Sequence, residues 1–197
     1  MSLAGNSIGG NISARVAITR PDLVKALMII DSSGFERPRL AGRAFCSLMS
    51  SHRFVRVIYP LFSKACMRAK TDADRRARAS AIAMTRTPPG ARALSAMWRS
   101  FKLPAHDLRS QASLFTAPTV LVWGRRDPVV TLKCGQAANE LIAGSSLVIA
   151  NSGHAPQTTD PTPVAAELIP LAESAFASTG PSPAAKSVLL PGKDGQP

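Results

Sequence analysis

The stretch that decides the fold is SLAGNSIGGNISARVAIT (residues 2–19), in which glycines surround one serine, Ser7. Residues 2–4 are typical of the end of a β-strand, and apolar residues then recur at helical spacing from Ile8 to Thr19. A proline two residues later ends the helical pattern. The stretch therefore predicts a strand, a sharp turn that carries Ser7, and a helix.

Three further apolar runs predict the other strands. KALMIID (residues 25–31) is short and flanked by turn residues, as is typical of a strand buried on both faces. With the preceding strand and helix it completes a β-α-β unit, which implies a parallel sheet. PTVLVWG (118–124) and SSLVIA (145–150) have the same character, and a helix is predicted between them at 131–142.

The C-terminal region predicts one more helix and a tail. The helix is expected over 158–177, with Asp160 or Thr162 as its cap and a kink or an early stop at Pro170. The tail, residues 178–197, is rich in Pro, Gly and Ser and is expected to be disordered.

The middle of the chain differs from both flanks, because helical patterns dominate and no strand is evident. Helices are predicted around 40–50, 53–68, 72–86 and 90–101. The chain is therefore divided into a first core part (1–35), a helical insert (36–112), a second core part (113–177) and the tail (178–197).

The basic charge is concentrated in the insert. The 197-residue chain has a net charge of +12, and its 45% hydrophobic residues favour a globular domain with a core over a disordered chain. Sixteen Lys or Arg and three Asp lie between Arg37 and Arg109, a net of +13, and the rest of the chain has a net of −1. Any electrostatic role is therefore expected in this segment.

Several classes of protein are disfavoured by the sequence. The longest aliphatic run, ALMII, is far shorter than a membrane span needs, and no signal-peptide pattern precedes it. The three cysteines, Cys46, Cys66 and Cys134, are too widely spaced for a disulfide framework or a zinc site. We therefore expect a cytoplasmic protein with reduced cysteines and no bound metal.

The serine turn itself has the pattern of a catalytic nucleophile. GNSIG (5–9) matches G-x-S-x-G between a strand and a helix, a turn with strained backbone angles that exposes the serine oxygen. Gly5 and Gly9 are expected to avoid a collision between helix and strand, and the N–H of Ile8 is free to stabilise an oxyanion. Asn6 belongs to the same turn. The alternative is a glycine-rich turn that binds a phosphate.

Two other residues follow predicted strands. Asp127, in WGRRDPVV (123–130), follows one strand, where a carboxylate can orient a histidine, although a turn aspartate is common there. His154, in SGHAPQTTDP (152–161), follows the last strand, whereas His52 and His106 lie in the insert. A loop histidine alone is usually a surface residue. Asp127 and His154 therefore indicate a catalytic site only in combination with Ser7.

The order Ser…Asp…His, each after a strand, resembles the α/β-hydrolase fold family. LAGNSIGG resembles its nucleophile elbow, VLVWGRRDPVV its acid-bearing strand end and SGHAPQTTDP its histidine loop, over about residues 1–177. The resemblance implies a partial α/β-hydrolase fold with a mostly parallel sheet and a helical cap at 36–112.

The same resemblance implies a serine hydrolase of the esterase or lipase type. Ser7 would be the nucleophile, His154 the general base and Asp127 the acid that orients it, with Asp31 as an alternative acid position. It implies no metal or organic cofactor, and a small-molecule ester or lipid-like compound as substrate. The rival interpretation is a non-enzymatic, degenerate fragment that binds a partner or is vestigial.

The family resemblance also implies about five strands and an oxyanion loop before the serine turn, and this sequence contains only a strand stub there. We therefore expect a truncated chain with one oxyanion donor, an exposed strand edge and an exposed face on its first helix. The alternative is a short chain completed by a partner polypeptide or a second copy, and the oligomeric state stays open.

In the simplest interpretation of the basic insert, its apolar residues line an acyl pocket and its arginines face water. Two other interpretations remain. One is a basic amphipathic lid in peripheral contact with anionic lipid. The other is nucleic-acid binding, which is disfavoured because no known module is present and aromatic residues make up only 5% of the chain.

One prediction follows from the expected truncation. The purified 197-residue chain should release little p-nitrophenol from short acyl esters, because loss of one oxyanion donor costs about 10²–10³ in rate. A monomer with ready turnover that is lost in Ser7→Ala would contradict this expectation.

Overall fold

The computed structural model describes residues 1–37, 40–66, 69 and 71–177, so the predicted tail at 178–197 lies outside the described residues. Within these ranges the chain forms four strands: β1 (Ser2–Asn6), β2 (Ala26–Ile30), β3 (Thr119–Gly124) and β4 (Ser146–Ala150). The helices of the core are α1 (Ile8–Thr19), α6 (Leu132–Leu141), α7 (Pro156–Thr159) and α8 (Pro161–Ala177). The four predicted strands are therefore confirmed.

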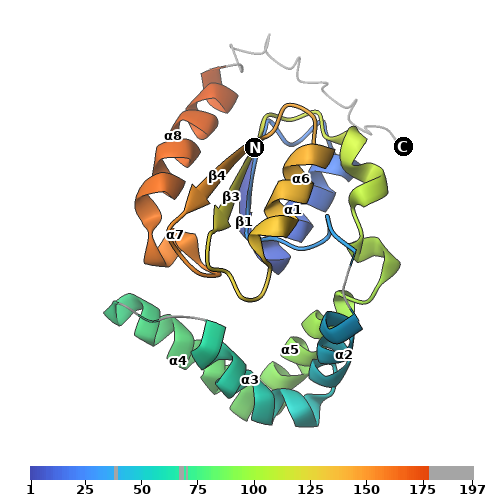
Figure 1. Ribbon diagram of the computed structural model, residues 1–197, viewed down its shortest axis with the longest axis vertical. Helices are drawn as coiled ribbons and strands as arrows, with labels where there is room; N and C mark the ends of the chain where they lie inside the picture. The colour runs from blue at the N-terminus through green and yellow to red at the C-terminus, as the bar shows by residue number, and fades with distance from the viewer. Residues whose placement is uncertain (38–39, 67–68, 70, 178–197) are drawn as a thin grey trace, which may run out of the picture.

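The strands form one parallel sheet in the order β1-β2-β3-β4, so spatial order equals chain order. Asn6 pairs with Ile30, and Gly124 pairs with Ala150. The carboxyl ends of all four strands therefore lie at the same end of the sheet, on the side of the helical insert (Figure 1). The predicted α/β class with a parallel sheet is confirmed.

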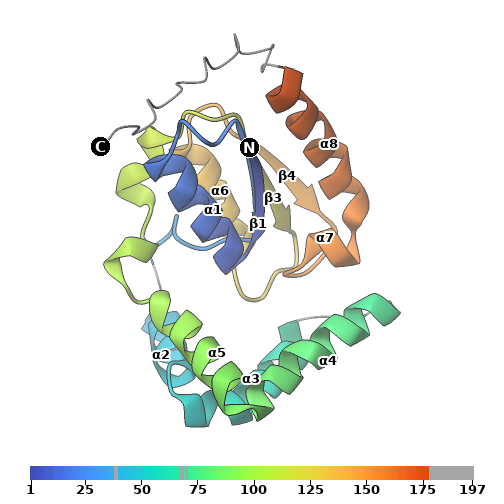
Figure 2. The same ribbon diagram turned by 180° about the vertical axis from the view of Figure 1, so that it is seen from behind.

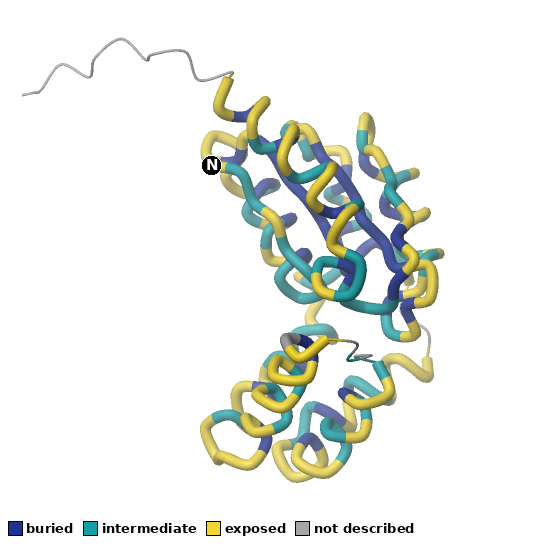
Figure 3. Tube along the Cα trace, turned by 90° about the vertical axis from the view of Figure 1, so that its left-hand side faces the viewer, coloured by how far each residue is buried: buried dark blue, intermediate teal, exposed yellow. Residues whose placement is uncertain are grey.

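The core lies on both faces of the sheet, with α1 and α6 on one face and α8 on the other (Figures 1 and 2). Every residue of β2 and β3 is buried, as the uninterrupted apolar runs predicted (Figure 3). Successive side chains alternate between the faces: Leu27 and Ile29 pack with Trp123 on the α1 and α6 side, whereas Met28 and Ile30 pack toward α8.

The strand β1 forms the edge of the described sheet, since it pairs with β2 alone among the described residues. Its residues are half-buried or exposed, in contrast to those of β2, and Ile12 on α1 is 56% exposed. The expected exposure of this edge and of one helical face is therefore present.

The described residues of the insert form four helices beyond the carboxyl ends of the strands (Figures 1 and 2). They are α2 (Leu40–Met49), α3 (His52–Cys66), α4 (Asp72–Arg86) and α5 (Pro88–Ser100). Two short 3₁₀ turns, Pro104–His106 and Arg109–Leu114, return the chain to the sheet. Local signals set the helix starts: a capping box of Thr71 and Asp74 begins α4, and Thr87 caps α5 ahead of two prolines.

The helical insert has a hydrophobic core of its own. The ring centroids of Phe45 and Phe62 both lie 5.3 Å from that of Trp98, each in an edge-to-face arrangement. Met49 and Val55 are fully buried beside them. The insert is therefore a packed layer rather than a long loop, and none of the helices in the described ranges combines the length and apolarity needed to cross a bilayer.

The last predicted helix differs from the observed structure. The chain forms a short α7 and then α8, with Asp160 between them, where its carboxylate accepts a hydrogen bond from the N–H of Asn151 at 3.1 Å. Of the two outcomes predicted at Pro170, a kink or an early stop, the early stop is wrong, because α8 runs on to Ala177. Buried residues on both sides of the proline, Val164 and Leu171, pack against the sheet and offset the about 3 kcal/mol that an interior proline costs.

The glycines at the serine turn have different roles. A methyl group on Gly5 would overlap the carbonyl of Gly9, and one on Gly10 would lie 2.7 Å from the Cβ of Ser32. A methyl group on Gly9 would meet nothing within 4 Å. The prediction that Gly9 avoids a collision is therefore wrong, because Gly9 faces away from the strand and Gly10 faces the end of β2.

This difference yields a matched pair of variants. Gly5→Ala should lower the free energy of unfolding by about 1–3 kcal/mol or more, because the new methyl group meets backbone that cannot move aside. Gly9→Ala should leave it unchanged or raise it by up to about 1 kcal/mol, since alanine favours the helix. Urea unfolding of both variants measures the two effects, and equal losses of stability would contradict the packing described.

Candidate active site

Ser7 occupies a strained turn between β1 and α1. Its backbone angles are φ 55° and ψ −121°, a conformation that residues other than glycine rarely adopt. The N–H of Ser7 donates to the carbonyl of Ile30 at 2.9 Å, and the hydroxyl of Ser32 donates to the carbonyl of Ser7 at 2.8 Å. The end of β2 therefore holds the serine in this conformation from both sides.

The loop after β3 supplies a buried carboxylate. The side chain of Asp127 is fully buried, and its Oδ1 accepts hydrogen bonds from the N–H groups of Val129 at 2.7 Å and Val130 at 3.1 Å. These bonds fix the carboxylate in its loop, as expected for a turn aspartate. They leave the second oxygen, Oδ2, for another partner.

That partner is His154 in the loop after β4. Its Nδ1 lies 2.7 Å from Oδ2 of Asp127, and its side chain is 15% exposed. Asp127 thus orients the ring by one nitrogen and leaves Nε2 for a proton exchange with another group. The structure therefore brings together Asp127 and His154, which lie at the ends of two different predicted strands.

Asn6 connects the serine turn to the histidine loop. Its side-chain amide donates to the carbonyl of His154 at 3.1 Å and to that of Ile30 at 3.3 Å. Among the described residues, no hydrogen bond joins the Ser7 hydroxyl directly to His154, and catalytic bonds of this kind are often long before substrate binds. The bridging role of Asn6 was not predicted, since it joins residues 148 positions apart.

Asp31 is a second buried carboxyl group in the same place. It follows β2 with a left-handed φ of 42° and is fully buried. Its Oδ1 accepts a hydrogen bond from the N–H of Gly124 at 2.8 Å, and its Oδ2 has no hydrogen-bond partner. Burial, together with the negative charge of Asp127, raises the pKa of Asp31 to about 8. The surroundings of Asp31 therefore favour its protonated form.

Ligand atoms of Asp31, Asp127 and His154 lie within 4.8 Å of one another. Three such groups could also coordinate a cation such as zinc. In the structure, however, the hydrogen bond between Asp127 and His154 joins two of the three groups, and a cation would have to compete with it.

Other polar side chains near the carboxyl ends of the strands have structural roles. Nε2 of His106 lies 2.8 Å from the hydroxyl of Ser33, and burial lowers the pKa of His106 to about 4, so the ring stays neutral. Asn11 donates to the carbonyls of both residues, at 3.0 and 3.2 Å. These bonds attach the end of the helical insert to the core, and they explain why His106 is not available as a second base.

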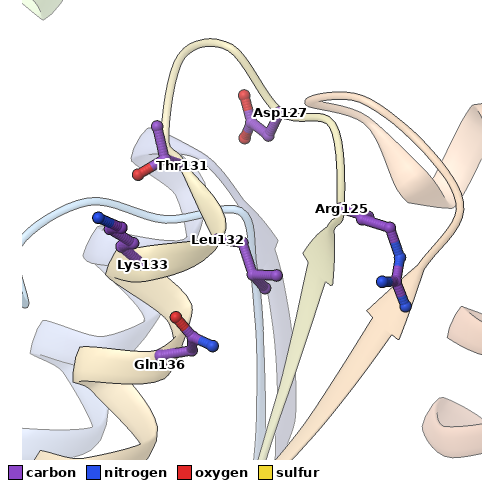
Figure 4. Close-up of a pocket in the computed structure, with 6 residues that line it drawn as sticks. All are labelled: Arg125, Asp127, Thr131, Leu132, Lys133 and Gln136. Atoms are coloured by element: carbon purple, nitrogen blue, oxygen red, sulfur yellow. The ribbon is translucent and has the colours of Figure 1, made fainter.

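An open hollow of about 540 Å³ lies beside the loop of Asp127 (Figure 4). It is lined by Arg125, Asp127, Thr131, Leu132, Lys133 and Gln136. Among the described residues, the lining includes Asp127 but neither Ser7 nor His154. The hollow therefore lies to one side of the candidate site and does not itself define a substrate position.

Ile8 is the first residue of α1, so its N–H has no carbonyl partner within the helix. Each candidate residue thus has a defined place: Ser7 and Ile8 after β1, Asp31 after β2, Asp127 after β3 and His154 after β4. This arrangement suits proton transfer at a serine hydroxyl next to a helix N-terminus.

Comparison with known proteins gives the family. A model of the alpha/beta hydrolase family matches residues 2–167. The candidate carbamate hydrolase RutD of Stutzerimonas stutzeri (strain A1501) is 26% identical over 164 residues, which are 81% of this chain and 61% of that protein. The chain therefore spans about three fifths of the length of the curated relatives it matches.

Two solved structures share the fold. A candidate lipase from Acinetobacter baumannii AYE has a TM-score of 0.69 at 18% identity, over 90% of this chain and 62% of that one. The 2-hydroxy-6-oxo-6-phenylhexa-2,4-dienoate hydrolase of Rhodococcus sp. strain RHA1 has a TM-score of 0.68 at 15% identity, over 89% of this chain and 63% of that one. With the match to the family model, the chain belongs to the alpha/beta hydrolase family.

Proposed function

We propose that this chain carries the catalytic residues of a serine hydrolase that acts on an ester or a related carbonyl bond. The observation that carries the proposal is the bond between Asp127 and His154 beside a serine held at φ 55°. Neither a phosphate-binding turn nor a structural cap requires a buried carboxylate–imidazole pair next to such a serine.

The residues would act in two half-reactions. His154 takes the proton of the Ser7 hydroxyl at Nε2 while the serine oxygen attacks the substrate carbonyl carbon. Asp127 stabilises the imidazolium that forms, and the N–H of Ile8 donates to the oxyanion. The proton then passes from Nε2 to the leaving group, and water releases the acyl group from Ser7 by the same steps.

The substrate class is an acyl compound with a polarised carbonyl group. The carbamate named for the RutD relative and the esters cleaved by lipases share this carbonyl, so one mechanism covers both. The chain spans about three fifths of the length of the curated relatives it matches. The activity of the whole protein is therefore part of what we propose here. The rival function, a fragment that binds a partner without catalysis, predicts a serine of ordinary reactivity.

Asp31 would act as a positioning residue. A carboxyl group that keeps its proton adds no second negative charge beside His154, so the cluster has one carboxylate for one imidazolium. The unpartnered Oδ2 of Asp31 can carry that proton toward Asp127. The asparagine variant, neutral and tolerant of a left-handed φ, reproduces this state.

Covalent labelling of Ser7 tests the proposal without requiring turnover. A fluorophosphonate probe should form a phosphonate ester on the oxygen of Ser7, with loss of fluoride, and mass spectrometry of peptides locates it. Ser7→Ala should remove the label, and His154→Ala should slow labelling by at least about 10²-fold because the general base is gone.

The control for the histidine is His52→Ala, an exposed position in α3, which should label at the rate of the unaltered chain. Equal labelling rates in the two histidine variants would contradict the proposed base. Label spread over several serines, or absent from Ser7 in the folded chain, would favour the fragment that binds without catalysis.

The burial of Asp31 should make the stability of the fold depend on pH. The folded Asp31 carboxyl keeps its proton up to about pH 8, whereas the unfolded one releases it near 3.8, so the unfolded state binds fewer protons in between. The free energy of unfolding should therefore fall with rising pH between these values, relative to Asp31→Asn, by at most about 1.4 kcal/mol per pH unit.

Urea unfolding of both proteins at several pH values measures this difference. Asp22→Asn is the matched control, since Asp22 is exposed and its bond to Arg20 lowers its pKa. This variant retains Asp31, so its stability should fall with rising pH in this window in parallel with that of the unaltered chain. Parallel pH profiles for the unaltered chain and Asp31→Asn would show that Asp31 is ionised in the fold.

A further inference from the structure

The third helix, α3, has two apolar faces. One packs into the core of the insert through Val55, which is fully buried, and through Phe62 against Trp98. The other face has Phe54, Val57 and Leu61 at 52%, 69% and 66% exposure. Residues spaced by three and four positions lie on one side of a helix, so these three form a continuous exposed stripe.

The stripe differs from ordinary exposed apolar residues. Single exposed apolar side chains are common on protein surfaces, whereas a contiguous group marks a site of interaction. Helix α3, which carries the stripe, belongs to the helical layer beyond the carboxyl ends of the strands (Figures 1 and 2). Its exposure is not explained by the packing of the core.

Positive charge accompanies the stripe. Arg53 and Lys64 are exposed and lie one turn before and two turns after Val57, on the same side of the helix. The sequence of α3 contains no acidic residue, and the segment from Arg37 to Arg109 has a net charge of +13. A partner for this face must therefore accept apolar side chains and supply negative charge.

We propose that the exposed face of α3, formed by Arg53, Phe54, Val57, Leu61 and Lys64, docks on the surface of a membrane that contains anionic lipid. The apolar stripe would enter the boundary between headgroups and acyl chains, and the two cations would meet lipid phosphates. A nucleic acid satisfies the charge but has no apolar phase for Phe54 and Leu61, so it fits this face less well.

Docking through this face would also affect where the candidate active site lies relative to the membrane. The helical layer stands on the side of the sheet where all four strands end, the side that carries Ser7 and His154 (Figure 1). Docking by α3 would bring that end of the molecule to the lipid surface. The docking itself does not depend on any catalytic role, because it uses neither residue.

The experiment is sedimentation of the chain with large vesicles. Phosphatidylcholine vesicles that contain phosphatidylglycerol should retain the chain at low salt, and phosphatidylcholine alone should retain much less. The triple variant Phe54→Ser, Val57→Ser, Leu61→Ser should lower the affinity for the anionic vesicles by about tenfold or more. The variant Arg53→Gln, Lys64→Gln should weaken binding and reduce its dependence on salt.

The matched control is Ile169→Ser with Phe176→Ser on α8, where side chains of similar size are 57% and 70% exposed. It should bind as the unaltered chain does, and circular dichroism checks that all variants keep their helices. Failure of the unaltered chain to bind anionic vesicles, or undiminished binding by the triple serine variant, would overturn the proposal. Preference for duplex DNA over anionic vesicles, lost in the variant Arg53→Gln, Lys64→Gln, would assign the face to nucleic acid instead.

Discussion

The close packing of Gly5 against the carbonyl of Gly9 is the constraint on which the candidate site depends. With no side chain at Gly5, α1 turns back directly over the end of β1, and only a sharp turn can make that connection. The residue in the turn, Ser7, then takes a positive φ. Its strain of about 1–3 kcal/mol is offset by hydrogen bonds to the end of β2.

The sheet converts this local turn into a shared site. Because β1 to β4 are parallel and adjacent in chain order, their four carboxyl ends stand in a row. Ser7, Asp31, Asp127 and His154 each follow one of these ends. Asp127 reaches His154 directly, and Asn6 attaches the serine turn to the histidine loop. The register of the four strands therefore places these residues close together, and each loop contributes one group to the candidate site.

The sequence predicted the features that depend on local pattern. The apolar runs predicted β2 and β3, and the glycines around Ser7 predicted the turn. The pairing of Asp127 with His154 followed from the expectation that parallel strands end at one edge. The serine itself has no hydrogen bond to the histidine among the described residues, so its role as nucleophile stays a proposal.

Other features depend on contacts that local pattern does not record. The orientation of α1 decides that Gly10, and not Gly9, faces Ser32. The protonation of Asp31 depends on its burial beside Asp127, which is distant in sequence. The continuation of α8 past Pro170 depends on packing against the sheet, which outweighs the local preference of proline. Each of these differences comes from tertiary packing.

The hydrogen bond from Nδ1 of His154 to Asp127 joins two of the loops that form the candidate site, and proton NMR tests it most directly. A proton held between these atoms resonates far downfield of the amide region. We expect such a signal in the folded chain, its retention in Ser7→Ala and its loss in Asp127→Asn. A spectrum without the signal, or a signal unchanged in Asp127→Asn, would contradict the pairing.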